Sequence, residues 1–385
     1  MAGKHIALFD LKLPAESIRL VNEVLKSGWL NTGPKVAQFE KSVASMVSVR
    51  YAVAVNSATA GLQLALESLG VGPGREVITT PFTFAATAAS IIRTGAMPVF
   101  ADIDPVTLNI DPDEVARKFT PRTACVLPVD VAGHPADYPE LADICDRRHI
   151  ALVADAAHSL GASIGRSSVA RVADAAVHSF QATKNLTTAD GGMVVTRHKI
   201  VADRVRLLSQ HAMTSNAYQR QKSRRWAYDV LAPGLKANLT DVHAAIGLGQ
   251  LASFEKNQQC REKIAERYCR NLADLSDFVA TPEVRDGYRH AWHLFIVRLH
   301  LSRLRIGQAR FIALMAQAGV ECGVHYRPLF DMSFYRGIGF TSQHFPNAAY
   351  AGKRVVTLPL YPGLKTPQID HVCDAIRQII TRYRR

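Results

Sequence analysis

The sequence lacks the features that mark several special classes of protein. Its six cysteines are irregularly spaced and form no C-x-x-C pair, so we expect neither a zinc knuckle nor a redox pair. No stretch of 18 consecutive apolar residues occurs, and the chain does not open on a charged region followed by an apolar one. These absences predict a protein of the reducing cytoplasm, with no membrane span and no secretion signal.

Patterns that bind metals or dinucleotides are also missing. The 14 histidines form no H-E-x-x-H pattern and have no cysteine partners at ligand spacing, so no metal site is predicted. The glycine run at 70–74 follows a predicted helix instead of preceding one, and it therefore indicates a turn. No internal repeat, low-complexity tract or long linker occurs.

What the sequence does have is an ordinary globular composition with an unusual charge. It is 385 residues long, 48% hydrophobic and 21% charged, and 46 basic against 33 acidic residues give a net charge of +13. This length is enough for two or three domains of roughly 100–200 residues each. The positive charge fits a nucleic acid, an anionic surface or an anionic small molecule, and composition does not choose among them.

Short apolar, β-rich runs alternate with helical stretches in the first half of the chain. Such alternation is typical of an α/β domain with a buried, mostly parallel sheet, here of seven strands. The predicted strands lie at 52–55, 76–82, 97–103, 124–130, 150–157, 175–181 and 192–196.

The pattern changes near residue 250. The later elements are helical regions at 239–274, 306–320 and 366–382 and strand-like runs at 291–299 and 324–329. We therefore predict a large α/β domain over 1–250 and a smaller α+β domain over 251–385.

Three features in fixed order carry the chemistry. The segment NSATAG at 56–61 follows a strand and opens a helix, where free backbone N–H groups and the hydroxyls of Ser57 and Thr59 suit a phosphate, although a plain helix cap is the alternative. Asp155 ends a buried strand, where a carboxylate needs a cation or strong donors, although a structural aspartate that caps the following turn is the alternative. Lys184 follows the next strand in a turn of small residues, where burial would make its amine neutral and available for a Schiff base, with a solvated lysine as the alternative.

Together, a phosphate cup, a strand-end carboxylate and a lysine predict an enzyme that uses pyridoxal 5′-phosphate (PLP). The phosphate would sit at the helix N-terminus, Asp155 would pair with the pyridinium nitrogen, and Lys184 would bond to the aldehyde carbon. Phe84, in the loop after a strand, could stack on the ring, with core packing as the alternative.

The sequence resembles the DegT/DnrJ/EryC1/StrS sugar aminotransferases, which are PLP enzymes of fold type I. The segments nearest to the branch that aminates UDP-4-keto-pentoses are SATAGLQ, VLAPGLKANLTD and HAWHLFIVRL. The other segments that carry the resemblance include GWLNTGPKVAQFE (28–40), VADAAHSLGA (153–162), HSFQATKNLTTADGGMVVT (178–196) and GVHYRPL (323–329).

The resemblance implies roles for individual residues. Lys184 would be the catalytic lysine and proton shuttle, Asp155 the ring-nitrogen partner and His158 a neighbour of the ring hydroxyl. The remaining expected cofactor ligands are Ser57, Ala58, Thr59, Phe84 and Ser179 from the same chain, with Lys236 or Asn238 reaching across from the neighbouring subunit of a homodimer with shared active sites. The expected substrate contacts are Trp29, Thr32, His293, His325, Tyr326 and Arg224, the last from the basic run 220–225, which is otherwise a solvated loop.

The expected reaction moves an amino group from an amino acid, by resemblance L-glutamate, which becomes 2-oxoglutarate, to a nucleotide-linked keto-sugar. Departures from the family pattern at Asp130, Asp190 and Ala237 bear on substrate preference and leave a keto-cyclitol or another non-nucleotide acceptor open. A regulatory or nucleic-acid-binding protein is a remote alternative, because no nucleic-acid-binding motif accompanies the charge.

Overall fold

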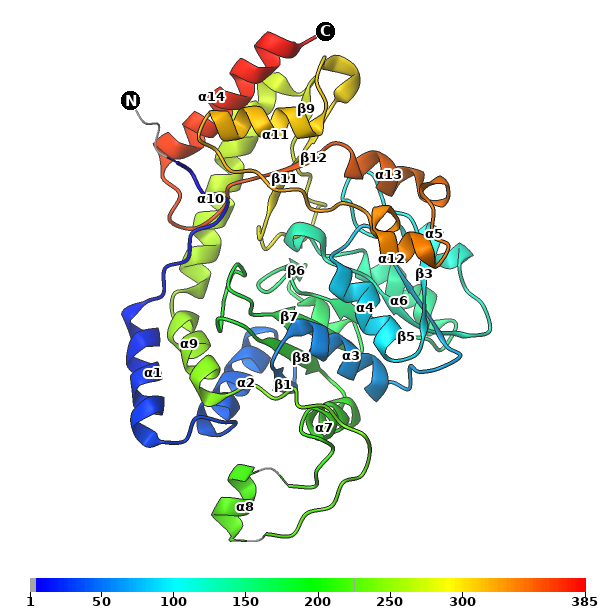
Figure 1. The fold of residues 1–385 in the computed structure, drawn as a ribbon, viewed down its shortest axis with the longest axis vertical. Helices are drawn as coiled ribbons and strands as arrows, with labels where there is room; N and C mark the ends of the chain where they lie inside the picture. Colours follow the sequence, from blue (N-terminus) through cyan, green and yellow to red (C-terminus); the bar gives the residue numbers. More distant parts are fainter. Residues whose placement is uncertain (1–4, 216, 225) are drawn as a thin grey trace.

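A seven-stranded sheet forms the centre of the larger part of the molecule (Figure 1). The structure is a computed structural model that describes residues 5–215, 217–224 and 226–385. In chain order the strands of this sheet are β1 (Tyr51–Val55), β2 (Glu76–Thr79), β3 (Met97–Phe100), β4 (Thr123–Leu127), β5 (Ala151–Asp155), β7 (Ala175–Ser179) and β8 (Gly192–Thr196).

The order of the strands across the sheet is β1-β8-β7-β5-β4-β2-β3. The neighbours from β7 to β3 are all parallel, and only β8 runs antiparallel to both of its partners. The prediction of a mostly parallel, seven-stranded α/β sheet is therefore confirmed, and each predicted run supplies one strand.

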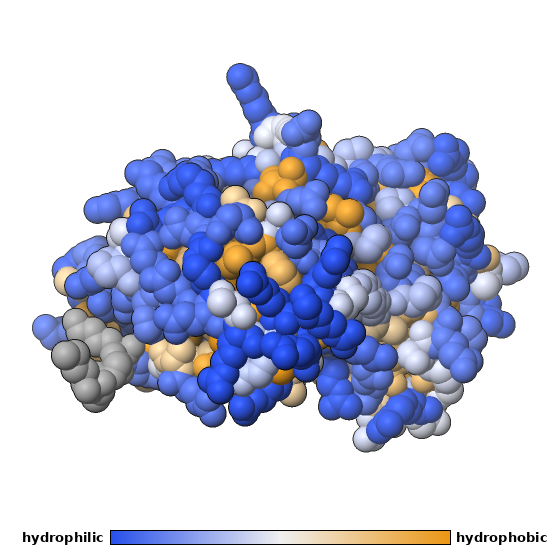
Figure 2. All heavy atoms as spheres, turned by 90° about the horizontal axis from the view of Figure 1, so that it is seen from above, coloured by the Kyte–Doolittle hydropathy of each residue, from blue (hydrophilic) through white to orange (hydrophobic). Residues whose placement is uncertain are grey.

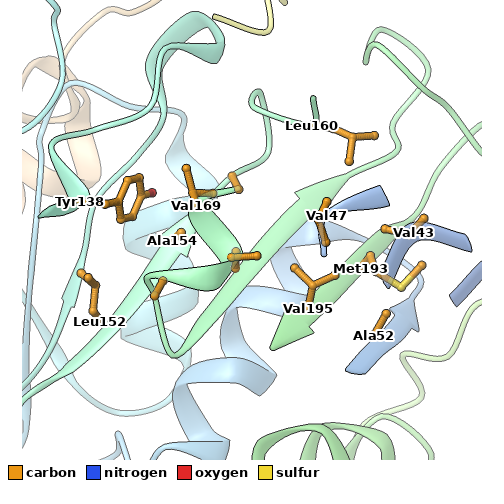
Figure 3. Close-up of a cluster of buried hydrophobic side chains, with 14 of the residues drawn as sticks. Val43, Val47, Ala52, Tyr138, Leu152, Ala154, Leu160, Val169, Met193 and Val195 are labelled. Carbon is orange, nitrogen blue, oxygen red and sulfur yellow. The ribbon is translucent and has the colours of Figure 1, made fainter. Parts of the chain in front are cut away.

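Helices cover both faces of this sheet, as its continuous apolar strands require. Alternate strand residues point to opposite sides: Ala52 and Val195 pack on one face, and Val53 and Val194 pack on the other. Figure 3 shows part of the first face, with Val43 near Met193 at one end and Tyr138 near Val169 at the other. This first face is covered by α2 (Pro34–Met46), α5 (Pro112–Arg117) and α6 (Tyr138–Asp146), and the second by α3 (Ala58–Ser68), α4 (Ala85–Arg93) and α7 (Lys199–Leu208).

The remaining helices of the larger part lie at its edge. The predicted helical region 239–274 is divided into α9 (Asp241–Leu251) and α10 (Phe254–Leu272), and α1 (Ala15–Ser27) packs along α9. The short helix α8 (Ala217–Ser223) projects away from the sheet on an extended segment (Figure 1).

A second sheet organises the C-terminal part. It has the antiparallel order β12-β11-β9, with β9 (Val279–Ala280), β11 (Phe295–Leu299) and β12 (Val355–Leu358). α10, α11 (Gln308–Gln317) and α14 (Thr366–Tyr383) pack on it in a core of its own. β6 (Ser163–Ile164) pairs with β10 (Tyr288–Arg289), and α12 (Ser333–Gly337) and α13 (Pro346–Gly352) complete the elements that touch the larger part.

The predicted strand at 324–329 is wrong. Only Gly323 pairs there, in an isolated bridge to Thr357, and the chain turns before a short 3-10 helix that begins at Leu329. Tyr326 and Leu329 are buried in a core cluster shared by the two parts of the molecule, so their apolar pattern reflects packing and not strand pairing. Pro328 also lacks the N–H that a paired strand would use.

The boundary at residue 250 stays a prediction. α10 passes from one core to the other, because Phe254 packs with the large sheet whereas Ile264 packs with the small one. The N-terminal Ile6 also packs with the small sheet and forms a bridge to Val320.

The surface is predominantly hydrophilic when the molecule is viewed from the C-terminal end, with small separate apolar patches (Figure 2). In the described part of the chain, no helix combines the length and the apolar character needed to cross a bilayer.

We expect Gly192→Ala to destabilise the protein, because Gly192 at the start of β8 lies against the backbone that opens α3. A Cβ at this position would lie 2.6 Å from the Ala58 nitrogen and 2.7 Å from the Ser57 carbonyl carbon, and backbone atoms cannot move aside cheaply. The expected loss of unfolding free energy is about 1–3 kcal/mol, measured by denaturant titration. Gly72→Ala, whose Cβ would meet nothing nearer than 3.8 Å, is the matched control and should change stability by less than about 0.5 kcal/mol.

Candidate active site

A cavity of about 550 Å³ opens at the carboxyl ends of the parallel strands, the usual ligand position in open α/β sheets. The helix α3, the loops after β2, β5 and β7, and the segments before β11 and after α11 all contribute to its wall. Predicted site residues that line it are Ser57, Ala58, Thr59, Phe84, Asp155, His158, Ser179, Lys184, His293, His325 and Tyr326.

The N-terminus of α3 forms one side of the cavity. The Ser57 hydroxyl accepts a hydrogen bond from the Ala60 amide at 3.2 Å, so Ser57 is a helix cap. The amides of Ala58 and Thr59 belong to the first turn, whose N–H groups have no acceptor within the helix. Gly61 lets this turn approach the sheet, because a Cβ there would lie 2.8 Å from the Val177 side chain. The segment therefore combines a cap with N–H groups that suit an anion.

Asp155 lies at the end of β5 and is only 5% exposed. The Thr87 hydroxyl donates to its Oδ2 at 2.7 Å, and the Ala157 amide donates to its Oδ1 at 3.3 Å. Burial raises the pKa of Asp155, and the hydrogen bond from Thr87 opposes that rise. Because Thr87 donates to Asp155, the Thr83 hydroxyl must donate to Thr87, at 2.8 Å. A cation placed against Asp155 would lower its pKa and favour the carboxylate.

Lys184 projects into the same cavity from the loop after β7. Burial lowers its pKa to about 8, while the negative charge of Asp155 acts in the opposite direction. Its Nζ lies 3.5 Å from His293 Nε2. About a tenth of this amine is therefore neutral at pH 7, far more than for a lysine at its usual pKa, which suits a lysine that forms a Schiff base.

Three histidines surround the lysine, and burial lowers the pKa of His158, His293 and His325, the last to about 4. Burial also raises the pKa of Tyr326, so this residue keeps its proton and can donate to His158 Nε2 at 3.0 Å. With Tyr326 as donor, the neutral His158 carries its proton on Nδ1. That atom is buried and has no hydrogen-bond partner among the described residues.

These features fit PLP. The first turn of α3 and Ser179 suit the phosphate, Asp155 suits a protonated ring nitrogen, and Lys184 supplies an amine for the aldehyde. The free Nδ1 of His158 is a donor that a ring hydroxyl oxygen could accept from. Phe84 lines the cavity but is 64% exposed, so its side chain is available to stack on a ring and is not part of the core.

The other predicted residues lie outside the cavity wall. Lys236 Nζ donates to Asn238 Oδ1 at 2.6 Å, and Asn238 Nδ2 donates to Thr32 Oγ1 at 2.5 Å. Trp29 Nε1 in turn donates to the Thr32 carbonyl at 3.2 Å. These four residues form a separate polar cluster beside α1 and α2. Arg224 is exposed after α8, and Arg225 of the same basic run lies outside the described residues.

Some residues of the cavity were missed by the sequence analysis. Thr83 lies just before α4 and Thr87 lies in its first turn, so no helical spacing pairs them, and the sequence carries no signal for their contact. Leu8 and Phe9 also line the cavity, and no local pattern indicates this. They reach it because Ile6 pairs with Val320 in the distant C-terminal part.

Asp130, the first of the three departures from the family pattern, does not line the cavity. It is fully buried, and its Oδ1 accepts hydrogen bonds from the Ala136 amide and the Tyr138 hydroxyl, both at 2.9 Å. Its Oδ2 contacts the Ser159 hydroxyl, in the turn that also carries His158. Burial raises the pKa of Asp130 to about 7. Its place behind the cavity wall supports that turn and gives no contact to a substrate.

The other two departures from the family pattern differ from each other. Ala237 is 2% exposed and packs in the core. The small side chain at this position therefore does not enlarge the cavity. Asp190 lines the cavity and remains available to a ligand.

Comparison with known proteins agrees with this geometry. The chain matches the DegT/DnrJ/EryC1/StrS aminotransferase family over residues 12–377. It is 42% identical over 380 residues to the spore coat polysaccharide biosynthesis protein SpsC of Bacillus subtilis strain 168, covering 98% of this chain and 97% of SpsC.

Solved structures of sugar aminotransferases have the same fold. The putative sugar aminotransferase Spr1654 of Streptococcus pneumoniae, in its PMP form, superposes with a TM-score of 0.91 at 29% identity, covering 99% of each chain. Its PLP form gives a TM-score of 0.90. DesI in the presence of its TDP-sugar product gives 0.89 at 30% identity, covering 99% of this chain and 94% of DesI.

We expect Asp130→Asn to stabilise the protein at alkaline pH. The pKa of Asp130 is raised from 3.8 unfolded to about 7 folded, so the stability that its proton brings is complete below about pH 4 and is lost as pH rises through about 7. The neutral asparagine avoids this loss. At pH 8 the variant should gain about 2–4 kcal/mol of unfolding free energy, measured by denaturant titration.

The gain should shrink as pH falls and vanish near pH 4. Asp146→Asn, which replaces an exposed carboxylate at the end of α6, is the matched control and should change the unfolding free energy by less than about 0.5 kcal/mol. A gain for Asp130→Asn that is independent of pH would contradict the raised pKa.

Proposed function

Because the chain belongs to the DegT/DnrJ/EryC1/StrS aminotransferase family, we propose that it moves an amino group from L-glutamate to a nucleotide-linked keto-sugar. It is a PLP-dependent sugar aminotransferase. The observation that carries the proposal is the presence in one cavity of the Lys184 amine, the Asp155 carboxylate and the N-terminus of α3.

The residues of the cavity divide the work. Bound PLP supplies an aldehyde that takes up and releases the amino group and a ring that withdraws electrons from the neighbouring carbon. Asp155 holds the ring nitrogen, α3 and Ser179 hold the phosphate, and Phe84 covers the ring. Lys184 Nζ, whose pKa lies near 8, takes a proton from the amino donor and returns one to the acceptor, so the same atom serves both halves of the reaction.

A nucleotide-linked acceptor is supported by two observations. DesI, a close structural neighbour, was solved in the presence of its TDP-sugar product. The chain also carries a net charge of +13, which favours an anionic substrate. Of the three departures that leave a keto-cyclitol open, Asp130 and Ala237 are buried and do not line the cavity, whereas Asp190 does, so only Asp190 could favour that alternative through direct contact with a substrate.

A homodimer with shared active sites is supported by exposed apolar side chains beside the polar cluster of Lys236 and Asn238. Trp226 is 88% exposed, Leu231 is 60% exposed and Val230 is 55% exposed. Large apolar side chains exposed within one short segment are candidates for a protein interface. A second copy of the chain would cover them and could bring Lys236 of the partner subunit to the phosphate.

A cytoplasmic location is the remaining part of the proposal. All six cysteines are free, and Cys125, Cys145 and Cys373 are buried. Unpaired cysteines are typical of proteins kept in a reducing compartment.

The central test is incubation of the PLP-loaded protein with L-glutamate and a panel of keto-sugar nucleotides, including UDP-4-keto-pentoses, followed by mass spectrometry of the amino-sugar. We expect amination of at least one of them. Free UDP, GDP or dTDP should inhibit the reaction competitively, because the nucleotide contributes binding. Amination of a keto-cyclitol with no inhibition by any nucleotide would overturn the proposal.

Lys184→Ala should lower kcat by at least about 10³-fold, because the cavity then has no amine to move the proton. Borohydride reduction and peptide mass spectrometry should find the cofactor attached to Lys184 in the wild type and to no residue in the variant. Lys199→Ala, on the exposed surface of α7, is the matched control and should keep both attachment and activity.

Shared active sites can be tested by mixing two impaired variants. Lys236→Ala should lose about tenfold in activity or cofactor retention, the value of one charge-assisted hydrogen bond to phosphate. If each site takes its Lys236 from the partner subunit, a mixed dimer with Lys184→Ala contains one intact site, and refolding the two together should restore activity above that of either variant. If Lys236 serves its own subunit, no mixed dimer holds an intact site, and activity should not rise.

A further inference from the structure

A chain of side-chain amides leads from α10 to the catalytic loop. Gln258 on α10 is 1% exposed, and its Nε2 donates to the His290 carbonyl at 3.3 Å. Its Oε1 therefore faces Asn185, which donates to it from Nδ2 at 3.4 Å. Asn185 directly follows Lys184 in the sequence.

The orientation of the Asn185 amide is fixed by a second contact. Its Nδ2 also donates to the Ala291 carbonyl at 2.7 Å, and a carbonyl oxygen can only accept. Both N–H groups of Asn185 are thus used, and its Oδ1 is the atom that faces His293 Nδ1, at 3.3 Å. An amide oxygen can only accept, so His293 carries a proton on Nδ1.

This assignment leaves His293 Nε2 without a proton. His293 is 7% exposed, and burial together with the nearby Lys184 lowers its pKa well below the usual value, so the ring holds one proton and not two. The bare Nε2 is the atom that lies 3.5 Å from Lys184 Nζ. Lys184 is therefore the donor in this contact, whether its amine is charged or neutral.

A neutral primary amine has two N–H bonds and one lone pair in a tetrahedral arrangement. When one N–H points at His293 Nε2, the lone pair cannot point there and is left for the interior of the cavity. We propose that His293, set in its tautomer by Asn185 and Gln258, is a positioning residue that orients the Lys184 amine for attack and proton transfer.

The inference rests on the proposed role of Lys184 and adds to the expected role of His293 as a substrate contact. Titratable groups other than His293 that line the cavity with Lys184 are Asp155, His158, Asp190, His325 and Tyr326. His325 provides a contrast, because its Nδ1 is hydrogen-bonded to the Thr357 hydroxyl at 2.8 Å.

The test compares two amide replacements at position 293. His293→Gln can place an acceptor near the position of Nε2, whereas His293→Asn reaches only as far as the contact with Asn185. The cofactor-free protein is mixed with PLP, and the rate of covalent capture by Lys184 is followed by absorbance from pH 6 to 10. Thermal unfolding of each variant checks that it is folded.

At high pH every Lys184 amine is neutral, so the plateau rate reports orientation alone. We expect this plateau to fall about tenfold in His293→Asn and to stay within about threefold of the wild type in His293→Gln. The midpoint of the His293→Asn profile should also lie at lower pH, because loss of an acceptor destabilises the ammonium form. The control His371→Asn, which changes an exposed histidine on α14 outside the cavity, should keep the wild-type plateau.

Equal plateaus for His293→Asn and the wild type would overturn the positioning role while leaving Lys184 as the attachment site. Capture that persists in Lys184→Ala would instead overturn the assignment of Lys184. A fall in the plateau that is the same for His293→Asn and His293→Gln would assign His293 to packing alone and would also overturn the proposal.

Discussion

Lys184 and Asp155 are two ionisable groups of opposite charge that line one cavity, and burial and their mutual attraction act on their pKa values in opposite directions. Burial favours the neutral form of each group and lowers the pKa of Lys184, while the carboxylate favours the ammonium form. As a result, the pKa of Lys184 is about 8, so the amine can be either charged or neutral near physiological pH. An amine in this range can both bond to an aldehyde and carry a proton.

Keeping Asp155 charged in such a place needs donors, and the surrounding structure supplies them from several elements. Thr87 comes from α4 and Ala157 from the turn after β5, while Thr83 supports Thr87. Asp130 holds that same turn from behind through Ser159. Asp130, just after β4, and Asp155, at the end of the adjoining β5, would repel each other if both were ionised, and the raised pKa of Asp130 leaves it largely protonated below neutral pH. The negative charge is thus concentrated on the residue that faces the cavity.

The sequence was enough to predict the sheet and the central residues. The strands can be located because buried parallel strands are apolar throughout, and Asp155 stands out as a polar group at the end of one of them. Lys184 lies in the loop after β7, where the small residues around it mark it. Thr87, the Asn185 network and the inward path of Leu8 were not predicted, since each depends on contacts between segments far apart in the chain. The prediction of a strand at 324–329 was wrong for a related reason. Apolar and polar residues alternate in this segment as they do in a strand, but the buried ones pack between the two units and form no strand pairs.

The cavity lies between the two units, so its geometry depends on how rigidly the units are held against each other. Lys184 and Asp155 come from the large sheet, whereas His293, His325 and Tyr326 come from the C-terminal part. The apolar cluster between the units includes Phe82 and Phe330, but apolar packing alone has little directional preference.

Hydrogen bonds between polar groups of the two units fix how the units are oriented relative to each other. Arg298 on β11 donates to the Val106 carbonyl at 2.8 Å, and Asp102 accepts from the Asn347 amide at 2.8 Å. Gln258 and Asn185 continue this pattern to His293, so the position of one imidazole nitrogen depends on hydrogen bonds from both units. A contact of 3.5 Å to a lysine amine can persist only if both sides are held in this way, and a shift of about 1 Å between the units would remove it. The rigidity of the junction is therefore part of the site, since it sets where Lys184 directs its lone pair.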